Sequence, residues 1–345
     1  MGVTIKDVAK LANVAPSTVS RVIANNPRIS DKTKQKVREA MDELGYHPNF
    51  IARSLANQST KVIGLVLPSS GDVFFQNPFF PTVLRGLSEG AHEKNFALQI
   101  TTGQTDEEIL DGVVQMVQGR RVDGVILLYS RVNDQIVSYL LERDFPFVVI
   151  GKPFKHEDRI THVDNDNFSA TKEATQHLIR LGHERIAFIG GDLELVVTLE
   201  RLLGYEKALE SIGVEINNSY IVHEPFLEEG GVEAVKKLMN LVSPPTAMIV
   251  TDDLMALGVL KKLNEHQYKV PRDISIVSFN NVLFGELSRP QLTSVDINIF
   301  ELGYQASKAL IDILETPNQE ARRISVPHTI VVRQSCQSLG EYVGL

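Results

Sequence analysis

Several Asp, Asn and Arg residues lie where an α/β protein presents side chains to a ligand. Asn280 comes directly after a short apolar run, and Asp252 comes two residues after another. Asp166 lies in a run of four Asp and Asn residues, and Arg201 lies early in a predicted helix. Carboxylate, amide and guanidinium groups bind hydroxyls by accepting or donating hydrogen bonds. These residue types therefore favour a binding site for a polyhydroxyl ligand.

An aromatic cluster, residues 74–80, follows the first apolar run of the body. Within it, Asn77 offers an amide and Phe79 offers a ring on which the apolar face of a polyhydroxyl ligand can pack. The alternative interpretation is that the phenylalanines of this cluster belong to the hydrophobic core. Both interpretations stay open at this point.

The polar candidates also have structural interpretations. Asp252 and Asn167 precede predicted helices, where an Asx side chain commonly accepts hydrogen bonds from backbone N–H groups as an N-cap. Arg201 could pair with Glu200 or Glu206 on its own helix.

Catalytic and metal-binding motifs are missing or misplaced. Gly86-Leu87-Ser88-Glu89-Gly90 matches the nucleophile elbow of serine hydrolases, but Ser88 falls inside a predicted helix with no strand leading into it. The sequence has no P-loop, no Gly-x-Gly-x-x-Gly and no His-Glu-x-x-His. Its nine histidines are scattered and Cys336 is its only cysteine. We therefore expect no enzyme activity, no cofactor and no metal site.

The body of the chain alternates short apolar runs with helical stretches, which is typical of parallel sheets covered on both faces. The alternation occurs twice, with a change near 151–165, and predicts two doubly wound lobes. The tail, 293–334, adds a strand, a helix and a strand that could cross back between the lobes. The predicted strands are 62–67, 97–101, 122–128, 147–150, 185–189, 220–223, 246–250 and 274–279. The predicted helices are 81–94, 106–118, 134–143, 168–181, 199–211, 230–241 and 253–266.

The first sixty residues have a different pattern. Apolar residues recur at helical spacing in 4–12 and again in 16–23, and Asn13 between them tolerates the left-handed backbone of a tight turn. The second helix begins at Pro16, a favoured first position, and combines a polar face with an apolar stripe. Two short helices joined in this way form a helix-turn-helix, whose second helix enters the DNA major groove.

A third helix is predicted from the cap Ser30 to Gly45, with a basic run on its outer side (Lys32, Lys34, Lys36 and Arg38). Beside a helix-turn-helix, such a run is expected to face phosphates. Residues 50–56 could form two further helical turns. A helix this short is marginal in water, so we expect it to be ordered only by DNA or a second copy.

Composition agrees with a DNA-binding head on a sensor body. The net charge is −8, but residues 1–60 hold nine Lys and Arg against five Asp and Glu, a net of +4 that leaves −12 for the rest. A basic unit on an acidic body is typical of a regulator that reads DNA. We expect a cytoplasmic protein, because the sequence shows no signal peptide and no apolar run that could span a membrane.

These motifs resemble the LacI/GalR family of bacterial repressors, and most closely the regulators of maltose and maltodextrin operons. The similarity covers essentially the whole chain. In the head it rests on Thr4-Ile5-Lys6-Asp7-Val8-Ala9, Thr18-Val19-Ser20-Arg21-Val22 and Gly45-Tyr46-His47-Pro48-Asn49. In the body it rests on Asn77-Pro78-Phe79-Phe80, Tyr129-Ser130-Arg131, Gly151-Lys152-Pro153, Leu181-Gly182-His183, Arg201-Leu202-Leu203-Gly204-Tyr205, Asp252-Asp253-Leu254-Met255 and Ser278-Phe279-Asn280-Asn281.

The resemblance implies a helix-turn-helix domain at 1–49, a hinge helix and linker at 50–60, and a body at 61–345 with the fold of type I periplasmic binding proteins. It also implies a homodimer whose heads read a double-stranded, pseudo-palindromic operator, with Arg21 suited to guanine and Leu55 wedged into the minor groove. The implied DNA-contacting residues are Thr4, Pro16, Ser17, Thr18, Arg21, Ser30, Thr33, Tyr46, Asn49, Arg53 and Leu55. The implied effector-binding residues are Asn77, Phe79, Asp166, Arg201, Asp252 and Asn280.

Two residues depart from the family pattern. Ala15 replaces a capping serine, so a phosphate contact is not expected there, and Asn280 stands where many sugar-binding members have aspartate. The resemblance predicts a repressor of a sugar-utilisation operon that a small sugar, with maltose or a maltodextrin favoured, releases from its operator. The alternative is a global carbon-catabolite regulator with a phosphocarrier protein as corepressor.

Overall fold

The computed structural model describes residues 3–46, 59–68 and 75–339. The chain divides into two compact units, Met1–Thr60 and Lys61–Leu345. Asn49, Arg53 and Leu55 and the expected hinge helix at 50–56 lie outside the described residues.

The head consists of three helices, α1 (Ile5–Leu11), α2 (Pro16–Ile23) and α3 (Asp31–Leu44). Thr4 is the N-cap of α1 and forms a capping box with Asp7. Asn13, in the turn between α1 and α2, has a φ of +52°, the left-handed conformation predicted for it. Gly45 ends α3 with a φ of +59°, which glycine adopts without steric cost. The predicted helix-turn-helix is confirmed.

The body contains two six-stranded sheets. The strands of the first lobe lie in the order β11-β5-β4-β3-β1-β2, and every pair is parallel. They are β1 (Val62–Val66), β2 (Ala97–Thr101), β3 (Gly124–Leu127), β4 (Phe147–Ile150), β5 (His162–Asp164) and β11 (Arg323–Ser325). The helices of this lobe are α6 (Phe79–Glu93), α7 (Asp106–Gln118), α8 (Gln135–Glu142) and α14 (Ile299–Glu315).

The second lobe has the strand order β12-β10-β9-β8-β6-β7, in which only the edge strand β12 is antiparallel. Its strands are β6 (Ile186–Gly190), β7 (Ile221–His223), β8 (Ala247–Val250), β9 (Ser275–Phe279), β10 (Thr293–Asp296) and β12 (Thr329–Val331). Its helices are α9 (Asn167–Arg180), α10 (Val196–Glu210), the short 3₁₀ turn η1 (Asn218–Tyr220), α11 (Glu228–Met239), α12 (Asp253–Glu265) and α13 (Leu283–Leu287).

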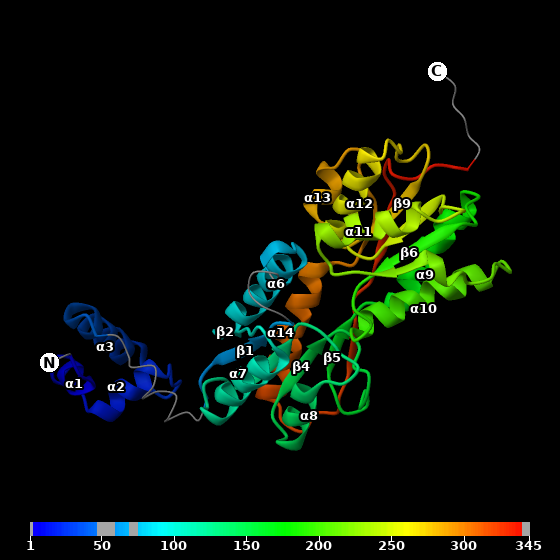
Figure 1. The fold of residues 1–345 in the computed structure, drawn as a ribbon. Coiled ribbons are helices and arrows are strands. Elements are labelled where there is room, and N and C mark those ends of the chain that lie inside the picture. The colour runs from blue at the N-terminus through cyan, green and yellow to red at the C-terminus, as the bar shows by residue number, and fades with distance from the viewer. Residues whose placement is uncertain (1–2, 47–58, 69–74, 340–345) are drawn as a thin grey trace. The chain divides into compact units, whose positions relative to one another are not determined.

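The chain crosses between the lobes three times (Figure 1). It leaves the first lobe after β5, returns after β10 to form α14 and β11, and crosses again to form β12. The expected return of the tail is therefore confirmed. Asn165, on the first crossing, connects all three by hydrogen bonds. Its side-chain amide donates to the carbonyl oxygen of Ile297 on the second crossing and to that of Val326 on the third, both at 2.9 Å.

Helices α6 and α14 pack closely in the first lobe. A β-carbon at Gly86 would lie 2.0 Å from the carbonyl oxygen of Phe300, and one at Gly303 would lie 2.2 Å from that of Val83. A β-carbon at Gly90 would lie 2.8 Å from that of Ser307. Gly86 and Gly90, the two glycines of the motif that resembles a nucleophile elbow, therefore allow α6 and α14 to approach each other. Ser88 between them is exposed in the middle of α6.

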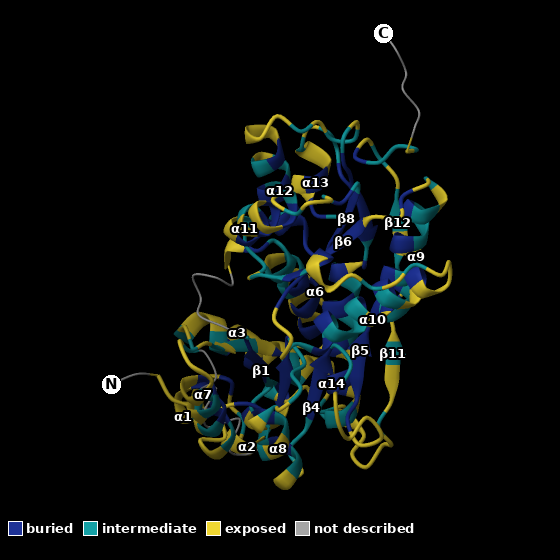
Figure 2. Cartoon of the chain, turned by 45° about the vertical axis from the view of Figure 1, so that its right-hand side comes forward, coloured by how far each residue is buried: buried dark blue, intermediate teal, exposed yellow. Residues whose placement is uncertain are grey.

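The central strands of both sheets are buried, whereas the outer faces of the covering helices are exposed (Figure 2). Near-continuous apolar strands are expected where helices cover both faces of a parallel sheet. No helix in the described part of the chain is long and apolar enough to cross a membrane.

Candidate functional site: an effector cavity and a DNA-reading helix

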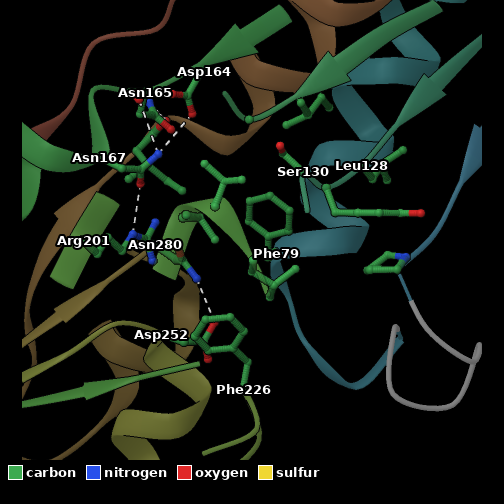
Figure 3. A pocket seen from close by; sticks show the side chains of 18 of the residues that line it. Phe79, Leu128, Ser130, Asp164, Asn165, Asn167, Arg201, Phe226, Asp252 and Asn280 are labelled. Atoms are coloured by element: carbon green, nitrogen blue, oxygen red, sulfur yellow. Dashed lines mark hydrogen bonds between the residues drawn. The ribbon is translucent and has the colours of Figure 1, made fainter. Parts of the chain in front are cut away.

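A cavity of about 300 Å³ lies between the carboxyl ends of the two sheets (Figure 3). Its wall includes residues that follow β1, β3, β6 and β8, the strands at which each sheet reverses its order. Ligands of doubly wound sheets bind at such switch points. Five of the six effector residues expected from the sequence line the cavity: Asn77, Phe79, Arg201, Asp252 and Asn280.

Asp252 joins the two lobes at one side of the cavity. Its Oδ2 accepts hydrogen bonds from the amide of Asn77, across the cleft at 2.9 Å, and from the amide of Asn280 at 2.8 Å. Its Oδ1 caps α12. Burial raises the pKa of Asp252, against the lowering effect of the hydrogen bond from Asn77. Asp252 is thus a helix cap and a cavity residue at once.

Arg201 is buried in the second lobe, where its guanidinium contacts two hydrogen-bond acceptors and one aromatic ring. Nε donates to Oδ1 of Asn167 at 3.0 Å, and Nη1 donates to the carbonyl oxygen of Thr251 at 2.6 Å. The group also lies 4.4 Å from the ring centroid of Phe279. Burial lowers the pKa of Arg201 to about 10. The structure therefore does not support the alternative pairing with Glu200, which instead bonds to Lys152 at 3.0 Å.

The residues of the run 164–167 have two roles, since one caps a helix and three line the cavity. Asp166 does not line the cavity; it caps α9, because its carboxylate accepts hydrogen bonds from the backbone N–H and the hydroxyl of Ser169. Asp164, Asn165 and Asn167 do line the cavity. The amide of Asn167 also donates to Asp164 at 3.0 Å.

Asn280 has a φ of +98°, an unusual conformation for a residue with a side chain. The buried carboxylate of Asp253 supports this loop by accepting hydrogen bonds from the N–H of Val282 at 2.8 Å and from Oγ of Ser278 and Ser294. The backbone after β9 is thereby held so that the amide of Asn280 faces Asp252.

Four aromatic residues line the cavity: Phe79, Phe80 and Tyr129 from the first lobe and Phe226 from the second. A β-carbon at Gly191 would lie 2.3 Å from the ring of Phe226, so glycine is required after β6 for this ring to lie there. Phe80 packs against the core, whereas Phe75 is 60% exposed. The aromatic cluster thus contributes to both the cavity and the core.

A second connection between the lobes involves backbone groups. The N–H of Val132 donates to the carbonyl oxygen of Glu194 at 2.9 Å, and the N–H of Val196 donates to that of Ser130 at 3.0 Å. Together with the Asn77–Asp252 bond and the Lys152–Glu200 ion pair, these contacts hold the two lobes against each other around the cavity.

Sequence reasoning missed several cavity residues of the first lobe. Ser130 and Arg131 follow β3, and Lys152 follows β4, at the carboxyl ends of strands that the sequence did predict. The rule that ligands bind at these ends would have found them. In contrast, the sequence around Glu200 and Phe226 contains no pattern that would have predicted their place in the cavity wall.

The second helix of the head presents a polar surface. Ser17, Ser20 and Arg21 are exposed, while Val19 and Val22 are buried at 0% and 3% exposure. Among the other residues expected to contact DNA, Thr4, Pro16 and Ser30 are exposed, and Thr18, Thr33 and Tyr46 are partly buried. The N-cap Ser30 accepts a hydrogen bond from the backbone N–H of Thr33.

Two segments of the chain match family models of known proteins. Residues 4–49 match the family model of bacterial regulatory proteins, lacI family, and residues 175–336 match that of a periplasmic binding protein-like domain. The regulator MalR of Streptococcus pneumoniae is 46% identical over 341 residues, which cover 96% of this chain and 99% of the relative. The chain belongs to the lacI family of bacterial regulatory proteins.

Two solved structures of this family extend the comparison. The lac repressor dimer bound to its operator and an anti-inducer is 25% identical, with a TM-score of 0.85, and the match covers 98% of this chain and 100% of that chain. The complex of the regulator CelR with cellobiose is 31% identical, with a TM-score of 0.77, over 96% and 99% of the two chains. The lacI-family chain described here is therefore a DNA-binding transcriptional repressor, and its relatives are regulators and not enzymes.

Proposed function

We propose that this repressor controls a sugar-utilisation operon and releases its operator when a small sugar, maltose or a short maltodextrin, binds between the two lobes. The proposal rests on the cavity at the strand ends, in which Asp252 accepts hydrogen bonds from residues of both lobes. The similarity to MalR favours maltose, and the CelR–cellobiose complex gives a precedent for a disaccharide in a relative.

The chemistry of the cavity suits a sugar. Asp252 and Asn280 supply acceptors and donors for vicinal hydroxyls, and Arg201 supplies a charged donor. Phe79 and Phe226 supply apolar surfaces for the faces of pyranose rings. A cavity of about 300 Å³ is at the lower end of the volumes of small-molecule sites.

Release would follow from competition for groups that now join the lobes. A sugar that bonds to Asp252 or Asn77 replaces their mutual hydrogen bond and changes how the lobes are held. The sugar shifts the repressor away from its DNA-binding state only by the difference between its affinities for the two states.

We propose that two copies bind one operator, with α2 of each head in the major groove. Ser17, Thr18 and Arg21 would contact base edges, and the remaining positions would contact phosphates or the minor groove: Thr4, Pro16, Ser30, Thr33, Tyr46, Asn49, Arg53 and Leu55. The exposed polar face of α2 and the similarity to an operator-bound dimer support this arrangement.

The short helix α13 offers a surface for the second copy. Its Leu283, Phe284 and Leu287 are 62%, 40% and 62% exposed (Figure 2), and exposed apolar clusters of this kind mark interaction sites. Leu287→Asp should therefore convert the dimer into a monomer at micromolar concentration. Analytical ultracentrifugation checks this, with Val242→Asp, a fully exposed residue outside α13, as the control. A variant at Leu287 that remains dimeric would exclude α13 from the interface.

Isothermal titration of the full chain with maltose, maltotriose and cellobiose tests the effector. The proposal expects binding of maltose or maltotriose; a lack of heat with all three sugars would reject it. The alternative, a global catabolite regulator, predicts no response to these sugars and tighter operator binding when a phosphocarrier protein is added.

A further inference from the structure

Asp164, the last residue of β5, is a buried carboxyl group with an unused oxygen. The residue is 3% exposed and lines the cavity (Figure 3). One oxygen accepts the hydrogen bond from Asn167 at 3.0 Å, whereas Oδ2 has no partner among the described residues. A buried carboxylate without a full set of hydrogen bonds is costly, so its place in a ligand cavity requires an explanation.

The charged groups around Asp164 come from several elements. Glu200 and Arg201 lie on α10 and Arg323 lies on β11, while Lys152, after β4, is bonded to Glu200. Burial, together with the nearby charge of Glu200, raises the pKa of Asp164 to about 7, against the lowering effects of Arg323, the backbone N–H of Asn165 and Arg201. The carboxyl group of Asp164 is therefore expected to populate both its protonated and its ionised form near neutral pH.

The cavity is poorly suited to an anion. Four acidic residues line it (Asp164, Asp192, Glu200 and Asp252), against three basic residues (Arg131, Lys152 and Arg201). Each basic residue already donates to an oxygen of the protein, namely on Asp106, on Glu200, and on Asn167 and Thr251. A ligand here would meet more acceptors than uncommitted cations, which favours neutral hydroxyl donors.

We propose that Asp164 is a specificity-determining residue of the effector site: its carboxylate accepts a hydrogen bond from a hydroxyl of a neutral sugar and disfavours phosphorylated sugars. This inference rests on the proposed function and adds to it a residue of the run 164–167 other than Asp166, the one that the resemblance implied. Asp164 also precedes Asn165, which ties the three crossings. A sugar bound to Asp164 would therefore lie next to the residue that connects the three crossings between the lobes.

Sugar binding at Asp164 should depend on pH. A hydroxyl donor binds the ionised carboxylate better than the protonated acid, so binding should lower the pKa of Asp164 and release a proton. Maltose should accordingly bind about tenfold more weakly at about pH 6 than at about pH 8.

Calorimetry of the full chain tests the inference with Asp164→Asn and with the exposed Asp158→Asn as matched control. The aspartate-to-asparagine change at Asp164 should weaken maltose binding at least about tenfold at about pH 8 and remove most of the pH dependence. Asp158→Asn should behave as the unmodified protein. Glucose 6-phosphate should give no binding to the unmodified protein at concentrations at which maltose saturates it.

The outcomes separate this inference from the proposed function. If maltose binds the unmodified protein and Asp164→Asn with the same affinity and pH dependence, the inference is wrong while the proposed function stands. Glucose 6-phosphate binding as tightly as maltose would also overturn it. If no sugar binds the unmodified protein, both fail. If circular dichroism shows that Asp164→Asn does not fold, the unmodified protein provides the test. Maltose titrations in buffers of different ionisation enthalpy then measure the number of protons released on binding. A lack of proton release would overturn the inference.

Discussion

Replacing Arg21 by methionine should reduce specific operator binding by about ten- to a hundredfold while changing non-specific binding only slightly. Arg21 is exposed on α2 beside the buried Val22, so its removal leaves the packing of the head intact. A bidentate contact from arginine to guanine contributes about 1–3 kcal/mol of discrimination. Gel-shift titrations with operator and with scrambled DNA measure both affinities.

Arg38→Met is the matched control for Arg21→Met, because it removes the same charge from an exposed position on α3. A phosphate contact at Arg38 predicts an equal loss of affinity for operator and for scrambled DNA, together with a weaker salt dependence. If Arg21→Met also weakens the two DNAs equally, Arg21 does not read base edges.

The second large effect is expected at Arg201. Arg201→Met leaves Oδ1 of Asn167 and the carbonyl oxygen of Thr251 without their donor, and both residues are buried. It also removes the positive charge near Asp164 and Asp252. We expect a loss of about 3 kcal/mol in the free energy of unfolding and at least about hundredfold weaker maltose binding.

Urea unfolding and calorimetry measure the two effects of Arg201→Met separately. Arg201→Lys keeps the charge but cannot reproduce the planar fork that bonds to two acceptors at once, so it should restore stability in part and sugar binding less. If Arg201→Met folds stably and binds maltose normally, the guanidinium is not part of the effector site.

Much of the fold follows from local patterns. The alternation of apolar runs and helices is strong in this chain, and β2, β4 and α7 have the predicted bounds, 97–101, 147–150 and 106–118. Asn13 and Gly45 could be assigned because a left-handed backbone is accessible to few residue types. Element ends that depend on tertiary contacts were less certain, such as that of α10, which begins at Val196 and not near 199.

The site was less accessible to sequence reasoning, because it depends on where a strand ends. Resemblance pointed to Asp166, but β5 ends at Asp164, and Asp164 and Asn167 line the cavity while Asp166 caps α9. Four consecutive polar residues carry no periodicity from which their directions could be derived. The paired carboxylate and amides of Asp252, Asn77 and Asn280 likewise come from positions far apart in the chain.

In the proposed mechanism, sugar binding in the cavity is coupled to DNA binding at the heads. The direct measurement is the operator affinity of the full chain, by gel shift at fixed salt, during a titration with maltose and maltotriose and with glucose 6-phosphate as a negative control. We expect the neutral sugars to lower operator affinity at least about tenfold and Arg201→Met to abolish this response. Unchanged operator affinity at sugar concentrations that saturate the cavity by calorimetry would contradict the proposed coupling.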